Sequence, residues 1–309
     1  MSSGGGTSSK TDLLNNQNRA NVTSMRYTFK DFREEYPDDD ACLDALFRMR
    51  FGKLKCCPFC GVVKAEFVRV KGRKCYSCVH CRSQLFPMAG TIFHKSTTPL
   101  WSWFYAIYLF SVSRNGVAAN ELERQLGVCH ETAWRIANRI RSAMSQGNDL
   151  LTGIVEADEA YIGGRRRSSN RYSNKTPVLG VVERKGRARV LVTDHASATT
   201  AIPFLKSNVA KGTVLHTDES GIYNRAHKTF DHHKVKHSDH EYVRGDDYTN
   251  TIEGFWGLFK PSLNGTYRSV SKKYLQLYVN EAVWKYNHRD QPLYPLLMEA
   301  VAQRVSGSH

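Results

Sequence analysis

The stretch TGIVEADEAYIGG, residues 152–164, marks the point where the sequence takes on the pattern of β-strands. Apolar residues lead into Asp158, and two further strand-like segments follow at 176–186 and 187–196. A helical segment near 199–209 and a strand at 212–218 come next, and the chain is helical again after 250. Strands that alternate with helical segments predict an α/β fold for this part of the chain.

Acidic residues stand at the ends of two of these strands. Asp158 ends the first one, and Asp218 ends the strand in VLHTDES, residues 214–220. Glu253 follows in TNTIEGFWGLFK, residues 249–260. Three carboxylates that converge from two strand ends and a helix can hold two Mg²⁺ or Mn²⁺ ions for phosphoryl transfer. Other acids stand nearby and could compete, with Glu156 the strongest competitor because it shares the strand parity of Asp158: Glu156, Glu159, Glu219, Asp246 and Asp247.

The segment that contains Glu253 has the pattern of an amphipathic helix. Glu253 and Lys260 are seven residues apart, so a helix returns them to nearly the same face. Large apolar residues lie between them, and we expect these to pack on the sheet: Ile252, Phe255, Trp256 and Phe259. The acid and the base would then face away from the core together.

Two C-x-x-C pairs, Cys57/Cys60 and Cys78/Cys81, are separated by seventeen residues. Each pair directs two thiolates toward one point, and four thiolates provide the tetrahedral ligand set of a structural Zn²⁺. We therefore predict one structural zinc ion. The alternatives are coincidence or redox dithiols, and Cys56 and Cys75 could compete as ligands.

Residues 120–144 predict two helices that are joined by a turn at Gly127. In the second helix the apolar residues share one stripe, whereas Arg135, Asn138 and Arg139 lie on the other side. Basic and amide side chains so arranged suit base edges in a major groove. This pattern predicts a DNA-binding helix-turn-helix, although a helical spacer with a solvated face would look similar.

Positive charge is concentrated near the cysteines. The formal net charge is +15, and residues 51–100 contain nine Lys or Arg but only one acid, Glu66. Such an excess favours a polyanionic partner such as nucleic acid, and a protein that is basic only for solubility is the alternative. We expect Arg73 and Lys74, between the cysteine pairs, to contact DNA phosphates.

The remaining segments give weaker signals. Residues 1–24 are rich in Ser, Gly, Asn and Thr, which predicts a disordered tail. No secretory signal is visible, and the longest apolar stretch, at 99–113, is too short to cross a membrane. We expect no membrane partner and a cytoplasmic, nucleoid-associated protein in a bacterium or a nuclear one in a eukaryote. Five histidines between 227 and 240 could indicate a second metal site, but their spacing follows no familiar ligand pattern, and the alternation in HHKVKH favours a strand.

Taken together, the motifs resemble those of DDE transposases of ISXO-type insertion sequences, which are relatives of the eukaryotic Merlin elements. The resemblance runs from about residue 36 to 305 and rests on CPFCG, YSCVHC, LERQLGVCHETAWR, EADEAYIGG, HTDES and EYVRGDDYTNTIEGFWGLFK. It implies an RNase H-like catalytic domain with Asp158, Asp218 and Glu253 as the metal-binding triad, and Lys260 in contact with DNA near the cut. Some relatives use Asn as the third ligand, which keeps Asn250 as an alternative.

The sequence departs from the family pattern at several positions without losing a metal ligand. Tyr248 stands where His is usual, Cys129 replaces a capping hydroxyl residue, and Arg268 and Ser269 stand where histidines are common. The cap of the recognition helix should be weaker as a result. Because the triad is intact, we expect an active enzyme.

The expected organisation has five parts. A tail at 1–24 precedes a helix and zinc ribbon at 25–95, a helix-turn-helix region at 96–148, the catalytic domain at 149–262 and C-terminal helices at 263–309. The expected function is that of a transposase, a homodimer on double-stranded DNA that cleaves transposon ends and joins them to target DNA. A catalytically silent transposon-derived regulator and a nuclease without strand transfer are the alternatives.

Overall fold

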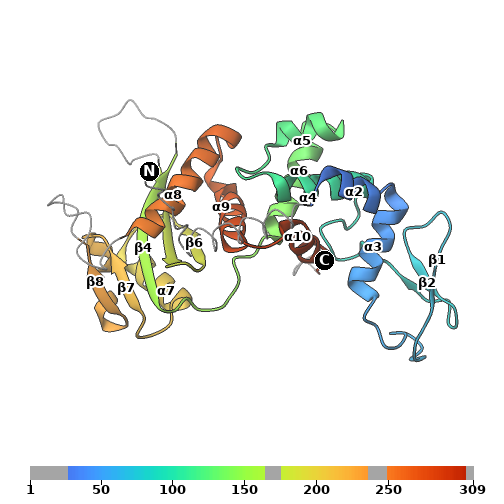
Figure 1. Cartoon of the computed structure of the whole chain (residues 1–309), viewed down its shortest axis with the longest axis horizontal. Helices are drawn as coiled ribbons and strands as arrows, with labels where there is room; N and C mark the ends of the chain where they lie inside the picture. The colour runs from blue at the N-terminus through green and yellow to red at the C-terminus, as the bar shows by residue number, and fades with distance from the viewer. Residues whose placement is uncertain (1–26, 164–174, 236–248, 304–309) are drawn as a thin grey trace, which may run out of the picture. The chain divides into compact units, whose positions relative to one another are not determined.

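The computed structural model describes residues 27–163, 175–235 and 249–303, and the chain forms two compact units (Figure 1). Among the described residues, the first unit holds 27–108 and 288–303, and the second holds those between 109 and 287. This grouping differs from the five expected segments, because residues 109–148 share a unit with the strands. The predicted tail at 1–24 lies outside the described residues.

Helices and a small three-stranded ribbon make up the first unit. The helices are α2 (Phe29–Glu35), α3 (Asp39–Phe51), the first part of α4 (Leu100–Val112) and α10 (Leu293–Ala302). The antiparallel ribbon contains β1 (Phe67–Arg69), β2 (Tyr76–Cys78) and β3 (Gln84–Leu85). The N-cap of α3 is Asp38, whose side chain accepts a hydrogen bond from the backbone N–H of Ala41 at 2.8 Å.

A five-stranded sheet forms the centre of the second unit. Its strands are β4 (Ile154–Ile162), β5 (Thr176–Glu183), β6 (Ala188–Val192), β7 (Val214–Thr217) and β8 (Asp231–Lys234), in the spatial order β6-β5-β4-β7-β8. β4, β5 and β6 are antiparallel neighbours, whereas β7 and β8 run parallel to β4. This is the topology of the RNase H-like fold, as the sequence resemblance implied.

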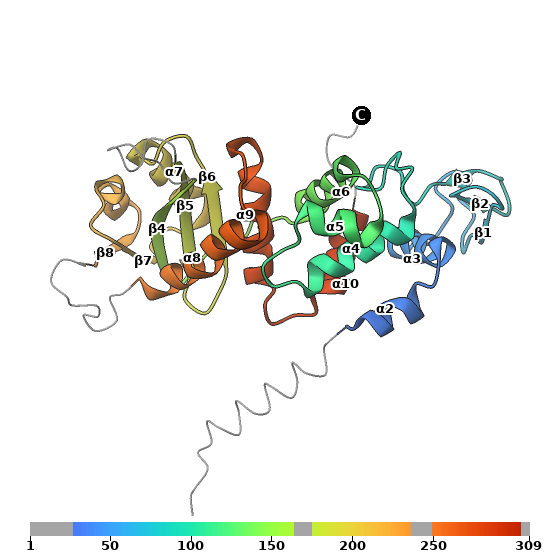
Figure 2. The same cartoon turned by 90° about the horizontal axis from the view of Figure 1, so that it is seen from above.

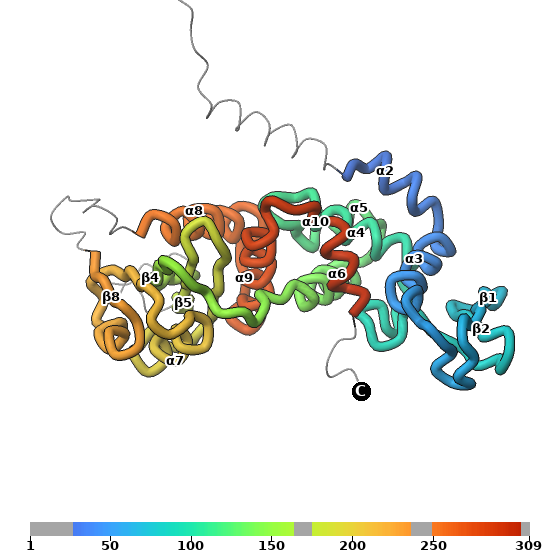
Figure 3. The backbone as a smooth tube through the Cα atoms, turned by 60° about the horizontal axis from the view of Figure 1, so that its bottom comes forward, coloured from blue at the N-terminus to red at the C-terminus, as the bar shows by residue number. Residues whose placement is uncertain are grey.

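Each face of this sheet has its own hydrophobic core. α7 (Ala198–Asn208) covers one face, while α8 (Asn250–Ser262) and α9 (Lys272–Asn287) cover the other (Figure 2). The tube view shows the sheet between α7 and α8 (Figure 3). The predicted stripe of α8 is confirmed, because Ile252, Phe255, Trp256 and Phe259 are all buried in the core on this face of the sheet, where α8 lies over β4 and β5. Each Å² of apolar surface that these side chains bury stabilises the fold by about 25 cal/mol, and this burial holds the helix on the sheet.

Two helices precede the sheet within the second unit. α5 (Ala119–Leu126) ends at Gly127, which has a left-handed φ of 63°, and α6 (His130–Ala143) begins after Cys129. Glycine suits this turn because it has no Cβ to clash at positive φ. Cys129 makes no side-chain cap hydrogen bond to the backbone, as expected for a thiol at this position.

A buried network of charges joins α6 to α9. Glu281 of α9 is 2% exposed, and it accepts hydrogen bonds from Arg141 Nε, Lys285 Nζ and the Tyr267 hydroxyl, each at 2.8 Å. Arg141 is 1% exposed and lies 4.1 Å from the ring centroid of Tyr278. Burial acts to raise the pKa of Glu281, but Lys285 and Arg141 outweigh it, so the pKa is lowered and the carboxylate stays charged.

Glu281→Gln is expected to lower the free energy of unfolding of the second unit by about 3–5 kcal/mol, because it leaves two buried cations without their anion. Urea unfolding followed by circular dichroism would measure this. Glu131→Gln on the exposed surface of α6 is the control and should change stability by less than about 0.5 kcal/mol. Equal stabilities for the two variants would contradict the structural role of the network.

No helix in the described part of the chain combines the length and the apolar character that a membrane span requires. Residues 231–234 form the edge strand β8, so this part of the histidine-rich segment is a strand. None of the described histidines belongs to a group of three or more close metal-binding side chains. His237 and His240 lie outside the described residues, so a metal role for the whole segment stays untested.

Candidate functional site

A cluster of carboxylates lies where β4 extends beyond β7. β4 pairs with β7 only as far as Ala157 and Thr217, whereas its pairing with β5 continues to Ile162. Asp158 and Asp218 are the next residues on the two parallel strands, so the register places them side by side. Side-chain oxygens of Asp158, Glu159 and Asp218 lie within 4.8 Å of one another. The sheet therefore brings together the two expected acids, but only Asp218 follows a strand end, because β4 continues past Asp158 to Ile162.

Hydrogen bonds hold these carboxylates in place. Asp158 Oδ2 accepts from the Trp256 indole N–H at 3.0 Å, and its Oδ1 accepts from the backbone N–H of Glu159 at 2.8 Å. Asp218 Oδ1 accepts from the backbone N–H of Ser220 at 3.0 Å. The site is thus supported by β4, by the turn after β7 and by α8.

The electrostatics of the cluster favour a bound cation. Burial, together with the charge of Asp218, raises the pKa of Asp158 to about 6, although Lys260 opposes the shift. Burial and the same two aspartates raise the pKa of Glu159 to about 7. Glu159 Oε2 is also buried without a hydrogen-bond partner among the described residues. A divalent cation would relieve the repulsion and occupy the unused oxygen, so the residues present fit Mg²⁺ or Mn²⁺.

Glu159 belongs to this cluster although its strand parity is opposite to that of Asp158. Its Oε1 accepts a hydrogen bond from the Ser220 hydroxyl at 3.2 Å. Beyond Ala157 the edge of β4 that faces β7 is open, so a long side chain on either face can approach Asp218. Strand parity ranked Glu156 as the strongest competitor, whereas the competitor that joins the cluster is Glu159, and its position next to Asp158 was the available signal.

Glu253 lies outside that group of three. It is exposed in the first turn of α8, where its Oε1 accepts a hydrogen bond from the Thr249 hydroxyl at 3.1 Å. Lys260 and Asn250 are exposed on the same helix, and the charge of Lys260 reaches Asp158. The choice of Glu253 or Asn250 as a further metal ligand stays a prediction.

The other acids that could compete do not join the cluster. Glu156 is fully buried and forms an ion pair with Arg184 at 2.7 Å. Glu219 is exposed, and Asp246 and Asp247 lie outside the described residues. Sequence reasoning missed two features that depend on packing. Trp256 was expected only as a core residue, but it donates a hydrogen bond to Asp158, and Gly180 is the partner of Asp158 on β5.

Gly180→Ala is expected to weaken Mn²⁺ binding by about 10–100-fold, the usual effect of disturbing groups that orient metal ligands. The new Cβ would lie 2.6 Å from Cζ2 of Trp256, so the indole must move away from Asp158. Calorimetric titration with Mn²⁺ would measure the affinity. Trp256→Phe removes the same hydrogen bond and should show a similar loss, whereas unchanged affinity in both variants would contradict this role of the indole.

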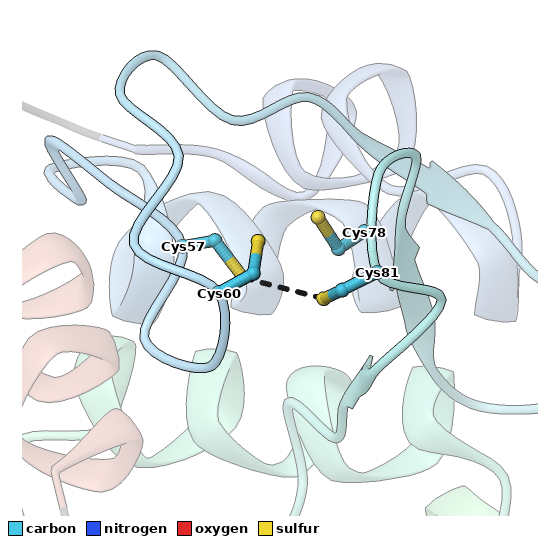
Figure 4. A group of neighbouring side chains, drawn as sticks. All are labelled: Cys57, Cys60, Cys78 and Cys81. Carbon is cyan, nitrogen blue, oxygen red and sulfur yellow. Dashed lines mark hydrogen bonds between the residues drawn. The ribbon is translucent and has the colours of Figure 1, made fainter.

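A second candidate metal site lies in the ribbon. The sulfur atoms of Cys57, Cys60, Cys78 and Cys81 lie within 4.8 Å of one another, and the Cys57–Cys81 sulfur distance is 3.8 Å (Figure 4). Hydrogen bonds from the hydroxyl and backbone of Ser83 lower the pKa of Cys81 to about 6, which favours the thiolate that binds metal. This cluster fits one structural Zn²⁺, as the spacing predicted.

The two competing cysteines lie elsewhere. Cys75 is buried and its thiol points to Gln84 Oε1 at 3.6 Å, while Cys56 is exposed outside the group of four. Arg73 and Lys74 are exposed near the turn between β1 and β2, and Lys74 lies 3.9 Å from Asp39. Their contact with phosphates stays a prediction.

The sequence prediction placed three residues on the outer face of α6, and for Asn138 it is wrong. Arg135 is exposed and Arg139 is partly exposed, but Asn138 is only 9% exposed. Its Oδ1 accepts a hydrogen bond from Arg141 Nη1 at 3.4 Å. The buried network around Arg141 turns this side of the helix inward, so Asn138 does not present its amide to a groove.

Two known families match parts of the chain. Residues 150–287 match the family described as ISXO2-like transposase domain, and residues 37–84 match the transposase zinc-ribbon domain. An uncharacterized protein in the transposable element ISH50 of Halobacterium salinarum is 28% identical over 246 residues, which cover 72% of this chain and 82% of that protein.

Solved structures also resemble part of the chain. The integrase catalytic core domain of HTLV-2, in complex with magnesium, is 15% identical, with a TM-score of 0.27, and the match covers 44% of this chain and 85% of that one. The simian T-cell lymphotropic virus intasome, in complex with PP2A regulatory subunit B56 gamma, is 13% identical over 60% of this chain and 66% of that one, with a TM-score of 0.31.

Proposed function

Because this chain has an ISXO2-like transposase domain with an N-terminal transposase zinc ribbon, we propose that it is a DNA transposase. It binds the inverted-repeat ends of a transposon, hydrolyses a phosphodiester bond there, and joins the 3′-OH ends to target DNA. The observation that carries this proposal is the convergence of Asp158 and Asp218 where β4 runs on past the end of β7.

The proposed roles of the residues follow from their chemistry. Asp158, Asp218 and Glu253 hold two Mg²⁺ or Mn²⁺ ions, and Glu159 lies close enough to take part. Such ions activate a water or hydroxyl nucleophile and stabilise the leaving oxygen. Lys260 contacts a phosphate of the bound strand, since it lies on the exposed face of α8 within electrostatic reach of Asp158.

DNA recognition is assigned to two regions of the chain. The helix pair α5 and α6 acts as a helix-turn-helix, in which Arg135 and Arg139 contact the major groove. Arg73 and Lys74 of the ribbon contact phosphates without reading the sequence. A homodimer on DNA follows from the need to hold two transposon ends in one reaction.

Incubation of the protein with end-containing double-stranded DNA and Mg²⁺ or Mn²⁺ tests the function. Both nicked and strand-transferred products are expected, and both should require the metal. Cleavage without joining would identify a nuclease instead. Binding without any cleavage would identify a catalytically silent regulator and would overturn the proposed enzyme activity.

Arg135→Ala is expected to weaken binding to the specific end by about 1–3 kcal/mol and to change binding to random DNA little. Arg124→Ala on α5 removes the same charge from a side chain that is paired with Glu121 at 2.6 Å, and it serves as the control. Fluorescence anisotropy with both DNAs at fixed salt would measure the difference. An equal loss on specific and random DNA would reassign Arg135 to phosphate contact.

A further inference from the structure

The first turn of α8 is capped by the sheet and not by its own N-cap residue. The N-cap is Thr249, whose side chain makes no capping hydrogen bond and instead donates to Glu253 at 3.1 Å. The backbone N–H groups of Thr251 and Ile252 donate to Glu156 Oε2 at 2.8 and 3.0 Å. The hydroxyl of Thr251 donates to Glu156 Oε1 at 2.9 Å. The side chain of Glu156, on β4, thus caps the N-terminus of α8.

The carboxylate of Glu156 is held in place by burial and by its hydrogen bonds. The residue is 0% exposed, and Oε1 also accepts from Arg184 Nε at 2.7 Å, so four donors surround its two oxygens. A buried carboxylate is costly unless it is paired and hydrogen-bonded, and negative charge at a helix N-terminus is favourable. With both oxygens occupied, Glu156 is unsuited to bind a cation directly, although its strand parity matches that of Asp158.

The cap lies close to two of the groups that α8 contributes to the carboxylate site. Glu253 follows Ile252 directly, and Trp256, one turn later, donates its hydrogen bond to Asp158. Asp158 is itself two residues beyond Glu156 on the same face of β4. The strand β4 therefore contributes the metal-binding residue Asp158 itself. Through Glu156 it also holds α8, the helix that contains Glu253.

We propose that Glu156 is a positioning residue for the active site, which sets the place of Glu253 and Trp256 relative to Asp158 by capping α8. This inference rests on the proposed two-metal function. The proposed role depends on the hydrogen bonds that Glu156 accepts from Thr251 and Ile252, and not on its ion pair with Arg184. It is therefore distinct from a general contribution to stability.

Two substitutions distinguish the helix cap from the ion pair. Glu156→Gln and Arg184→Gln both break the same ion pair, but only the first removes an acceptor oxygen from the first turn of α8. We expect Glu156→Gln to weaken Mn²⁺ binding by about 10–100-fold, as changes behind metal ligands do. Amide exchange in residues 249–260 should become faster, while exchange in β5 stays slow. Arg184→Gln should leave both the Mn²⁺ affinity and the exchange in 249–260 within about threefold of wild type.

The double variant Glu156→Gln/Arg184→Gln provides a rescue. Without the guanidinium, the glutamine can turn its carbonyl oxygen to the N–H groups of Thr251 and Ile252, so part of the Mn²⁺ affinity should return. Thr251→Val removes one donor and should show a smaller loss in the same direction, which covers the case that Glu156→Gln does not fold. In cleavage assays, Glu156→Gln should lower kcat and leave the KM for end DNA unchanged.

Equal losses of Mn²⁺ affinity in Glu156→Gln and Arg184→Gln would overturn the proposal, since the ion pair alone would then explain both. Unchanged affinity and exchange in Glu156→Gln and Thr251→Val would overturn it as well. Mn²⁺ titration and amide exchange need no DNA, so they test Glu156 even if the wild-type protein fails to cleave transposon ends. That failure would count against the proposed function alone.

Discussion

Asp218→Asn is expected to reduce cleavage of end DNA by more than about 100-fold while binding to the end is retained. Groups that only orient metal ligands contribute about 10–100-fold, and the loss of a ligand should cost more. The substitution keeps the shape of the side chain and the hydrogen bond from Ser220, but it removes one of the three carboxylates of the cluster. Single-turnover cleavage and anisotropy binding would be measured side by side.

Glu219→Gln is the matched control, because it removes a charge from the next residue, which is exposed. Its cleavage should remain within a few-fold of wild type. The pair Glu253→Gln and Glu159→Gln then identifies the further acid: the variant with the larger loss lacks a metal ligand. Lys260→Ala should instead weaken end binding and reduce its salt dependence. Normal cleavage by Asp218→Asn would overturn the two-metal mechanism.

Loss of zinc is expected to unfold the ribbon. Its three strands contain three, three and two residues, and several large apolar side chains of this region remain exposed: Phe59, Val63, Val68 and Phe86. So small a hydrophobic core leaves the metal as the main source of stability. Structural zinc contributes about 10–16 kcal/mol to the folding of small zinc domains. Cys78→Ser, which alters a buried ligand, should therefore lose both the zinc and the protection of residues 53–86 from amide exchange.

Cys56→Ser is the control for that experiment, because Cys56 stands beside Cys57 but outside the group of four sulfurs. It should retain one zinc ion per chain and a folded ribbon. Residues 109–287 should keep their exchange protection in both variants, since they form the other unit. Retention of one zinc ion per chain by Cys78→Ser would show that the ligands are assigned wrongly.

Much of the fold was predictable from local patterns. The spacing of Cys57, Cys60, Cys78 and Cys81 is enough to predict the cluster, because a metal site depends on few residues at short separation. The buried stripe of α8 follows from helical periodicity. The five-stranded order of the sheet was available only through the family resemblance, since strand pairing between distant segments leaves no local signature.

The candidate site was predictable only in part. Asp158 and Asp218 were found because each follows an apolar run, and the parallel register of β4 and β7 makes them adjacent, although β4 continues past Asp158 to Ile162. The capping role of Glu156 and the close packing of Gly180 under Trp256 depend on contacts between residues about 75–95 positions apart along the chain, which no sequence period encodes. Asn138 was misplaced because a helical wheel cannot show a polar network such as that around Arg141 and Glu281.

The Arg141–Glu281 network also bears on how this protein can evolve. The helix pair α5 and α6 shares buried charges with α9, so it is not a module that recombination could exchange for another. We expect a chimera that receives α5 and α6 from a distant relative to fail to fold, unless Arg141 and its partners arrive together. New preferences for transposon ends would then arise by single changes on the outer surface of α6, such as at Arg135, and lineages would diverge in target gradually and not by domain shuffling.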